Sequence, residues 1–174
     1  TNREAVKAVR RKLHNIIAPY LGDPVYEQAG AALGLSFASG DDAHTRETLR
    51  HILEQHASTR ERLPHLEEFY ERIFALTGKP ETILDLACGL NPLSFPWMNL
   101  PPHTAYHAFD IHLPRVKFLN QYFQLQSMEK LAEQRDILLT PPLQQGDVAF
   151  LFKEAHRLEQ RQRGCNIMLW EAVN

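Results

Sequence analysis

The sequence predicts an α/β fold in which an all-helical N-terminal segment precedes a parallel, Rossmann-like sheet. Apolar residues recur at helical spacing through the first 78 residues. The run Gly78-Lys79-Pro80 then ends this pattern. Beyond it, strand-like segments alternate with helical or loop stretches, which is typical of βαβ units. We therefore predict a helical domain over residues 1–78 and an α/β domain over residues 79–174.

Four helices are predicted in the N-terminal segment. The first covers residues 3–18 and the fourth residues 58–76, and each begins with the spacing of a capping box, Thr1 with Glu4 and Ser58 with Glu61. The second begins at Asp23-Pro24, and the third runs from Asp42 or Thr45 to Gln55.

Strands are predicted at residues 82–86, 105–111, 135–139 and 147–152. These are too few for a complete sheet of this kind, and a fourth strand left at an edge is an association hazard. We therefore expect the chain to be a fragment that lacks its natural start and whose remaining strands follow Asn174.

Composition places the protein among cytoplasmic globular proteins. The two cysteines, Cys88 and Cys165, are far apart and form no disulfide framework, and we find no signal peptide and no membrane-spanning run. The histidines near residue 107 suggest a metal cluster, but strand alternation separates His107 from Asp110 and His112. We expect a monomer that binds neither a membrane nor a metal ion.

The first twelve residues carry a local concentration of positive charge, although the whole chain has a net charge of −2. A basic helix attracts phosphate, so this segment is a candidate RNA-binding element, and a solvated charged face is the alternative. The basic residues are Arg3, Lys7, Arg10, Arg11 and Lys12.

The run from Ile83 to Pro92 has the pattern of an S-adenosylmethionine site. An apolar strand that contains Asp85 leads into Ala87, Cys88 and Gly89, whose side chains are too small to block a nucleoside at the carboxyl end of the strand. A dinucleotide site is the competing interpretation, but it requires G-x-G-x-x-G and only Gly89 is present.

The next strand supports this interpretation, because it ends in Asp110 about twenty residues further on. A carboxylate at this place is able to accept hydrogen bonds from both ribose hydroxyls of a nucleoside. The alternative is an N-cap for the helix that Pro114 indicates, and both roles are compatible.

Four stretches of the chain occur in a characteristic order and spacing. They are His56-Ala57-Ser58-Thr59-Arg60-Glu61-Arg62-Leu63, residues 84–93 (LDLACGLNPL), Phe109-Asp110-Ile111-His112, and residues 146–153 (GDVAFLFK). Together they resemble the aminoglycoside-resistance 16S rRNA guanine-N7 methyltransferases, over the whole chain. The resemblance implies the S-adenosylmethionine methyltransferase form of the Rossmann-like fold.

The resemblance also implies roles for individual residues. Arg62 would bind the carboxylate of the cofactor, Asp110 its ribose, and Asp136 with Ile137 its adenine. Independently of the resemblance, Lys153 ends the fourth predicted strand, at the edge where ligands bind in open α/β sheets, and is a candidate for contact with substrate. The alternatives are a surface ion pair of Arg62 with Glu61, a loop aspartate and a solvated lysine. The full set of expected cofactor contacts is Arg62, Asp85, Ala87, Gly89, Asn91, Asp110, Ile111, Asp136 and Ile137.

The activity that the resemblance implies is methylation of guanine N7 in the decoding site of 16S rRNA within the 30S subunit, which confers aminoglycoside resistance. Because N7 carries an exposed lone pair, no general base is required. Phe95, Trp97 and Phe152 are candidates for stacking on the target base. The alternatives are a non-catalytic module that binds the cofactor or RNA, and a methyltransferase with another substrate.

Overall fold

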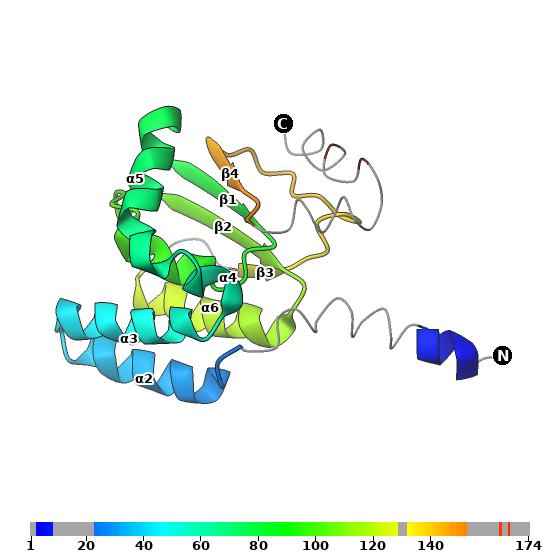
Figure 1. Cartoon of the computed structure of the whole chain (residues 1–174), viewed down its shortest axis with the longest axis horizontal. Helices are drawn as coiled ribbons and strands as arrows, with labels where there is room; N and C mark the ends of the chain where they lie inside the picture. The colour runs from blue at the N-terminus through cyan, green and yellow to red at the C-terminus, as the bar shows by residue number, and fades with distance from the viewer. Residues whose placement is uncertain (1–2, 9–22, 129–131, 153–163, 165–166, 168–174) are drawn as a thin grey trace.

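A parallel sheet of four strands forms the centre of the computed structural model, which describes residues 3–8, 23–128, 132–152, 164 and 167. The strand order is β3-β2-β1-β4, so the α/β prediction is confirmed (Figure 1). The strands are β1 (Thr82–Leu86), β2 (Ala105–Asp110), β3 (Ala132–Gln134) and β4 (Val148–Phe150). Since all four strands are parallel, the carboxyl ends of β1 and β2 meet at one edge of the sheet.

The prediction for β1 is confirmed, β2 ends one residue earlier than predicted and β4 is shorter than predicted. The prediction for β3 is wrong, because the strand precedes residues 135–139. Those residues form a turn in which Asp136 Oδ1 accepts a hydrogen bond from the backbone N–H of Leu138 at 3.0 Å. The apolar run was misleading because Ile137 packs on Leu86 and Phe109, in a cluster separate from the core beneath the helices, without extending the sheet.

The helical part differs from its prediction mainly at the fourth helix. It divides into three short elements, because Pro64 supplies no N–H and favours a turn. No Ser58–Glu61 capping box forms, since His56 is the N-cap of α4 and makes no side-chain cap. The elements are α2 (Tyr26–Ala38), α3 (Asp42–Glu54), α4 (Ala57–Arg60), η2 (Leu63–His65), α5 (Leu66–Thr77), η3 (Asn91–Trp97) and α6 (Leu113–Leu125).

Two other predicted helix starts need correction. α2 begins at Tyr26 after the N-cap Val25, later than the predicted Asp23-Pro24. Asp41, and not Asp42 or Thr45, caps α3, and its carboxylate accepts hydrogen bonds from two backbone N–H groups. Residues 3–8 are helical as predicted, whereas the capping box at Thr1 and the rest of the first helix lie outside the described residues.

One hydrophobic core joins the helices to the sheet. α6 packs on β2 and β3, α2 packs on α6, and α3 packs on α2 and η3, so these helices lie together below the sheet in Figure 1. Leu33 and Leu49 from α2 and α3 are fully buried in the same cluster as Tyr106 and Tyr122. This shared core crosses the domain boundary predicted at residue 78, and the boundary itself stays a prediction. Of the described helices, none has the length and apolar character to cross a lipid bilayer.

Candidate functional site

The turn after β1 brings backbone, rather than side chains, to the edge of the sheet. Ala87 and Gly89 both adopt positive φ angles, 53° and 58°. The N–H of Cys88 between them donates to the carbonyl of Phe109 in β2 at 2.9 Å, which ties the turn to the neighbouring strand. The carboxyl end of β1 is therefore formed by small residues, as predicted.

Gly89 lies directly against the buried ring of His56. A Cβ at position 89 would approach His56 Cε1 to 2.9 Å, so only glycine fits without movement. Burial lowers the pKa of His56 to about 4, and the nearby Arg115 guanidinium acts in the same direction. His56 is thus a neutral imidazole near pH 7, and it forms the wall behind the turn.

We expect Gly89→Ala to destabilise the fold by about 2 kcal/mol, because it combines left-handed backbone strain with overpacking. Equilibrium denaturation by urea would measure the loss. Gly34→Ala is the matched control, since this glycine lies within α2 and a Cβ there would meet nothing within 4 Å. The control should gain up to about 1 kcal/mol from helix propensity. Equal stability of the two variants would contradict the proposed fit.

Arg62 extends from the N-cap of η2 toward this turn. Its guanidinium donates to Ser58 Oγ at 3.2 Å and to Asn91 Oδ1 at 3.0 Å. It also lies 4.6 Å from the ring centre of Phe152, which holds it by a cation–π contact. Its Nε is buried and has no hydrogen-bond partner among the described residues. The side chain is therefore fixed beside the turn, and its Nε–H donor is not used by any of the described residues.

Asn91 connects Arg62 to a buried network of hydrogen bonds. Its Oδ1 also accepts from the Tyr70 hydroxyl at 2.7 Å, and its Nδ2 donates to Asp85 Oδ2 at 2.9 Å and to the Tyr106 hydroxyl at 3.2 Å. The Tyr106 hydroxyl in turn donates to Asp85 Oδ2 at 2.6 Å. All four hydrogen-bonding positions of the Asn91 amide are used within the protein. The structure thus shows Asn91 bound to Arg62, and the predicted cofactor contact of Asn91 itself stays a prediction.

Asp85 lies below this network and is only 1% exposed. Burial raises the pKa of its carboxyl to about 7, against the opposing effect of hydrogen bonds from Tyr106 and Asn91. The structure therefore places Asp85 behind Asn91, not on the open side of the turn where the sequence suggested a cofactor contact.

Asp110 lies at the end of β2, beside the turn, and is 5% exposed. Its Oδ2 accepts from the N–H of Gly89 at 3.0 Å and from Arg115 Nη1 at 2.8 Å, while Oδ1 accepts from the N–H of His112 at 2.8 Å. A carboxylate has about four acceptor positions, so one remains, on Oδ1. The sequence predicted that Asp110 accepts hydrogen bonds from both ribose hydroxyls, and this ribose contact stays a prediction. The N-cap of α6 is His112, not Asp110.

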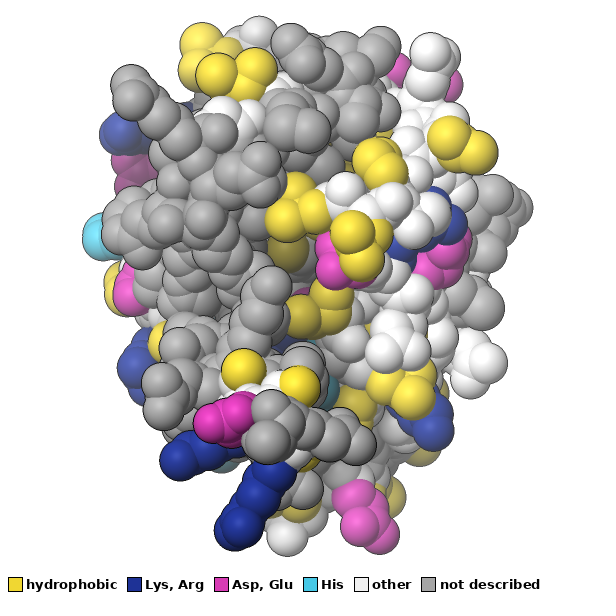
Figure 2. Space-filling model, turned by 90° about the vertical axis from the view of Figure 1, so that its right-hand side faces the viewer, with side chains coloured by type: hydrophobic (Ala, Val, Ile, Leu, Met, Phe, Trp, Pro, Cys, Tyr) yellow, Lys and Arg dark blue, Asp and Glu magenta, His cyan; other side chains and the backbone are white. Residues whose placement is uncertain are grey.

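The remaining predicted cofactor residues follow β2 and β3. Ile111 is 45% exposed at the edge of the sheet, whereas Ile137 is buried. The exposed Asp136 uses one carboxylate oxygen in its own turn. Figure 2 views the molecule from the side to which the strands point, and hydrophobic side chains gather in the middle of that face. Lys153 lies outside the described residues.

Two of the three aromatic candidates for base stacking are buried in the core. Phe95 packs edge to face on Tyr106, and Trp97 is 5% exposed in the core, beneath Arg46 and Arg50. Only the half-buried Phe152 lies next to the site, stacked on Phe150 at 4.9 Å.

The sequence did not reveal Asp23, His56 and Arg115, which lie behind the turn. Arg115 donates to both Asp110 and Asp23, and the latter is 92 residues away in the chain. A local signal for Arg115 was its position in the first turn of α6, the helix that follows Asp110.

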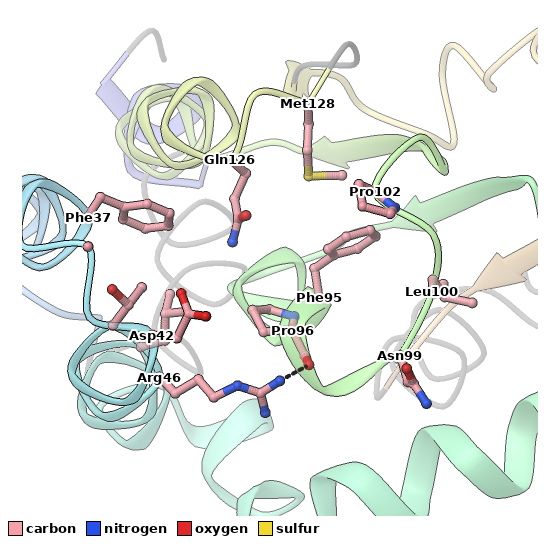
Figure 3. A pocket seen from close by; sticks show the side chains of 13 residues that line it. Phe37, Asp42, Arg46, Phe95, Pro96, Asn99, Leu100, Pro102, Gln126 and Met128 are labelled. Atoms are coloured by element: carbon pink, nitrogen blue, oxygen red, sulfur yellow. Dashed lines mark hydrogen bonds between the residues drawn. The ribbon is translucent and has the colours of Figure 1, made fainter.

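A separate pocket of about 500 Å³ opens near the amino end of β2 (Figure 3). Phe37, Phe95 and Leu100 are among its lining residues, and Arg46 closes one side by donating to the carbonyl of Pro96 at 2.9 Å. None of the predicted cofactor residues lines it. Within the described ranges, no group of three or more His, Cys, Asp or Glu residues is placed to hold a metal ion.

Comparison with known proteins gives consistent matches. A family model described as ribosomal RNA methyltransferase (FmrO) matches residues 1–174. The chain is 37% identical over 174 residues to a 16S rRNA (guanine(1405)-N(7))-methyltransferase of Frankia casuarinae, with 98% of this chain and 60% of the relative covered. It is 38% identical over 173 residues to the protein of the same name from Micromonospora echinospora, with 98% and 62% covered.

Solved structures agree with these matches. The 16S rRNA methylase RmtB superposes with a TM-score of 0.83 at 30% identity, covering 100% of this chain and 66% of that one. The 16S rRNA methyltransferase RmtF, solved in complex with S-adenosyl-L-homocysteine, gives a TM-score of 0.80 at 31% identity, covering 98% and 63%. The chain thus spans about three fifths of the length of the curated relatives it matches.

Proposed function

Because the chain belongs to the ribosomal RNA methyltransferase (FmrO) family, we propose that it methylates guanine N7 in the decoding site of 16S rRNA, with S-adenosylmethionine as the methyl donor. The relatives carry this activity in their names. We further propose that the substrate is the 30S subunit, that the protein acts as a cytoplasmic monomer without a metal ion, and that the modification confers aminoglycoside resistance.

The observation that carries the proposal is that Arg62 and Asp110 both lie beside the same turn of small residues, where Arg62 binds Asn91 and Asp110 binds Gly89. Arg62 has a buried Nε without a partner among the described residues, which suits a carboxylate ligand. Asp110 keeps one acceptor position on Oδ1, which suits a ribose hydroxyl. These two groups match the amino-acid and sugar parts of the proposed cofactor, so the residues present fit it.

The chemistry requires positioning more than acid or base groups. When bound, S-adenosylmethionine supplies an electrophilic methyl group on a sulfonium. Arg62 would hold its carboxylate and Asp110 its ribose, while Asp136 and the backbone of Ile137 would contact its adenine. Guanine N7 is already a free lone pair at neutral pH, so no protein group needs to remove a proton. Orientation of two reactants can contribute roughly 7 to 11 kcal/mol to such a step.

Recognition of the RNA is proposed for the basic N-terminal segment. Arg3 and Lys7 lie four residues apart on an exposed helical stretch, which places both charges on one face. Arg10, Arg11 and Lys12 continue the segment outside the described residues. Lys153, also outside them, is a further candidate for contact with substrate.

The proposed function predicts transfer of a labelled methyl group from S-adenosylmethionine into 16S rRNA of purified 30S particles. Cleavage of the labelled rRNA at N7-methylguanosine would locate the base. We expect one guanine in the decoding site to carry the label, and we expect binding to 30S particles to weaken steeply with added salt because phosphate contacts release counterions. Label only in protein or in small molecules would refute the proposal.

A further inference from the structure

A ring of polar contacts closes behind the turn that carries Gly89. Arg115 donates from Nη1 to Asp110 Oδ2 at 2.8 Å and from Nη2 to Asp23 Oδ2 at 2.7 Å. The same Asp110 oxygen accepts from the N–H of Gly89 at 3.0 Å. Asp23 Oδ1 lies 3.8 Å from His56 Nε2, and the His56 ring lies against Gly89. One aspartate just before α2 thus contacts both residues that support the turn.

This ring is largely removed from water. The side chains of Arg115 and Asp110 are 3% and 5% exposed, and that of Asp23 is 15% exposed. A buried charge is tolerated when it is paired and hydrogen-bonded, and here a single guanidinium is divided between two carboxylates. The Tyr26 hydroxyl also donates to Asp23 Oδ2, which fixes the Asp23 carboxylate on the Arg115 side. The whole arrangement therefore has a defined geometry.

The sharing of the Arg115 guanidinium between Asp23 and Asp110 affects how it binds the Asp110 carboxylate. Nη2 of Arg115 binds Asp23, and Nη1 binds Asp110 at Oδ2. The other oxygen, Oδ1, accepts the backbone N–H of His112 and, among the described residues, keeps an acceptor position. Without Asp23, the planar fork of Arg115 is free to close on both oxygens of Asp110, which is its preferred geometry with a carboxylate.

We propose that Asp23 and Arg115 are positioning residues for the cofactor, which keep an acceptor position of Asp110 open for a ribose hydroxyl. This inference rests on the proposed function. Asp23 precedes α2 and Asp110 ends β2, so the arrangement also makes the placement of the helical segment a condition for ribose binding.

The test is calorimetric titration of the protein with S-adenosylhomocysteine and with its 2′,3′-dideoxy analogue. We expect Asp23→Asn to weaken binding of S-adenosylhomocysteine roughly 3- to 30-fold, in the range of couplings between residues of one polar network. The loss for the dideoxy analogue should be less than about twofold, because that ligand has no hydroxyl for Asp110 to accept. Glu27→Gln, an exposed acid-to-amide change in the first turn of α2, is the matched control and should bind both ligands as wild type does.

Arg115→Lys is the second variant, in case Asp23→Asn does not fold. Lysine keeps the charge but lacks the fork that serves two carboxylates, so the same ribose-dependent loss is expected. Equal losses for the two ligands would indicate a merely structural role and overturn the inference, as would wild-type affinity of either variant. Failure of the wild-type protein to bind S-adenosylhomocysteine would instead refute the proposed function, and the inference with it.

Discussion

Replacing Arg62 with alanine is expected to weaken binding of S-adenosylhomocysteine by about 100-fold. A charge-assisted hydrogen bond contributes about 1.5 to 3 kcal/mol, and a guanidinium can form two of them with a carboxylate. The side chain is already held by Ser58, Asn91 and Phe152, so little ordering entropy opposes the contact. Isothermal titration calorimetry would measure the loss, and methyl transfer to 30S particles should fall in parallel.

Two further variants make this prediction specific. Arg60→Ala removes an exposed arginine two residues away, at the end of α4, and the affinity of this variant should stay within about twofold of wild type. Arg62→Lys should lose affinity to an intermediate degree, because one ammonium group cannot replace a planar fork shared with Ser58 and Asn91. Wild-type affinity of Arg62→Ala would exclude this side chain from the cofactor site.

The parts of the fold that the sequence predicted well are those with a strong local pattern. The apolar run before Ala87 and the run that ends at Asp110 give β1 and β2 to within one residue. β3 was misplaced because its three residues, Ala132–Gln134, have no strand pattern of their own, and pairing with β2 holds them in the sheet. Local patterns do not record such tertiary pairing.

The same distinction applies to the site. Arg62, Gly89 and Asp110 could be predicted because each lies within or beside a recognisable stretch. The contacts of Arg115 with both Asp110 and Asp23 could not, since Asp23 is 92 residues from Arg115 and its neighbours show no ligand-binding pattern. The burial of Asp85 could not be predicted from the sequence either. It results from Tyr106 and Asn91, which belong to other segments and donate hydrogen bonds to the Asp85 carboxylate.

Burial of Asp85 and His56 has opposite consequences for the pH dependence of stability. Asp85 has a pKa of about 7 in the folded protein and 3.8 ordinarily, so its contribution to stability is present at low pH and is lost as pH rises from about 4 to 7. His56 has a pKa of about 4 in the folded protein and 6.5 ordinarily, so stability is lost as pH falls from about 6.5 to 4. Between these limits the two effects nearly cancel.

In Asp85→Asn, the contribution of His56 to the pH dependence of stability should therefore no longer be cancelled. The amide oxygen can accept from Tyr106 and Asn91 as the carboxylate does, but it does not titrate. The free energy of unfolding of Asp85→Asn, minus that of the wild type, should rise by about 1.4 kcal/mol per pH unit between pH 5 and 6.5 and become constant above about pH 7.5. Urea unfolding at a series of pH values would measure the difference, in which all other titrating groups cancel.

His56→Gln is the complementary variant in the same experiment, and the opposite pH dependence is expected for it. Its free energy of unfolding, minus that of the wild type, should fall with a similar slope from about pH 4.5 to 6.5 and stay constant above that. A double variant should show neither slope, because both shifted groups are gone. A flat difference for Asp85→Asn would mean that its carboxyl is ionised throughout this range, and the hydrogen bonds around Asn91 would then have to compensate a buried charge fully.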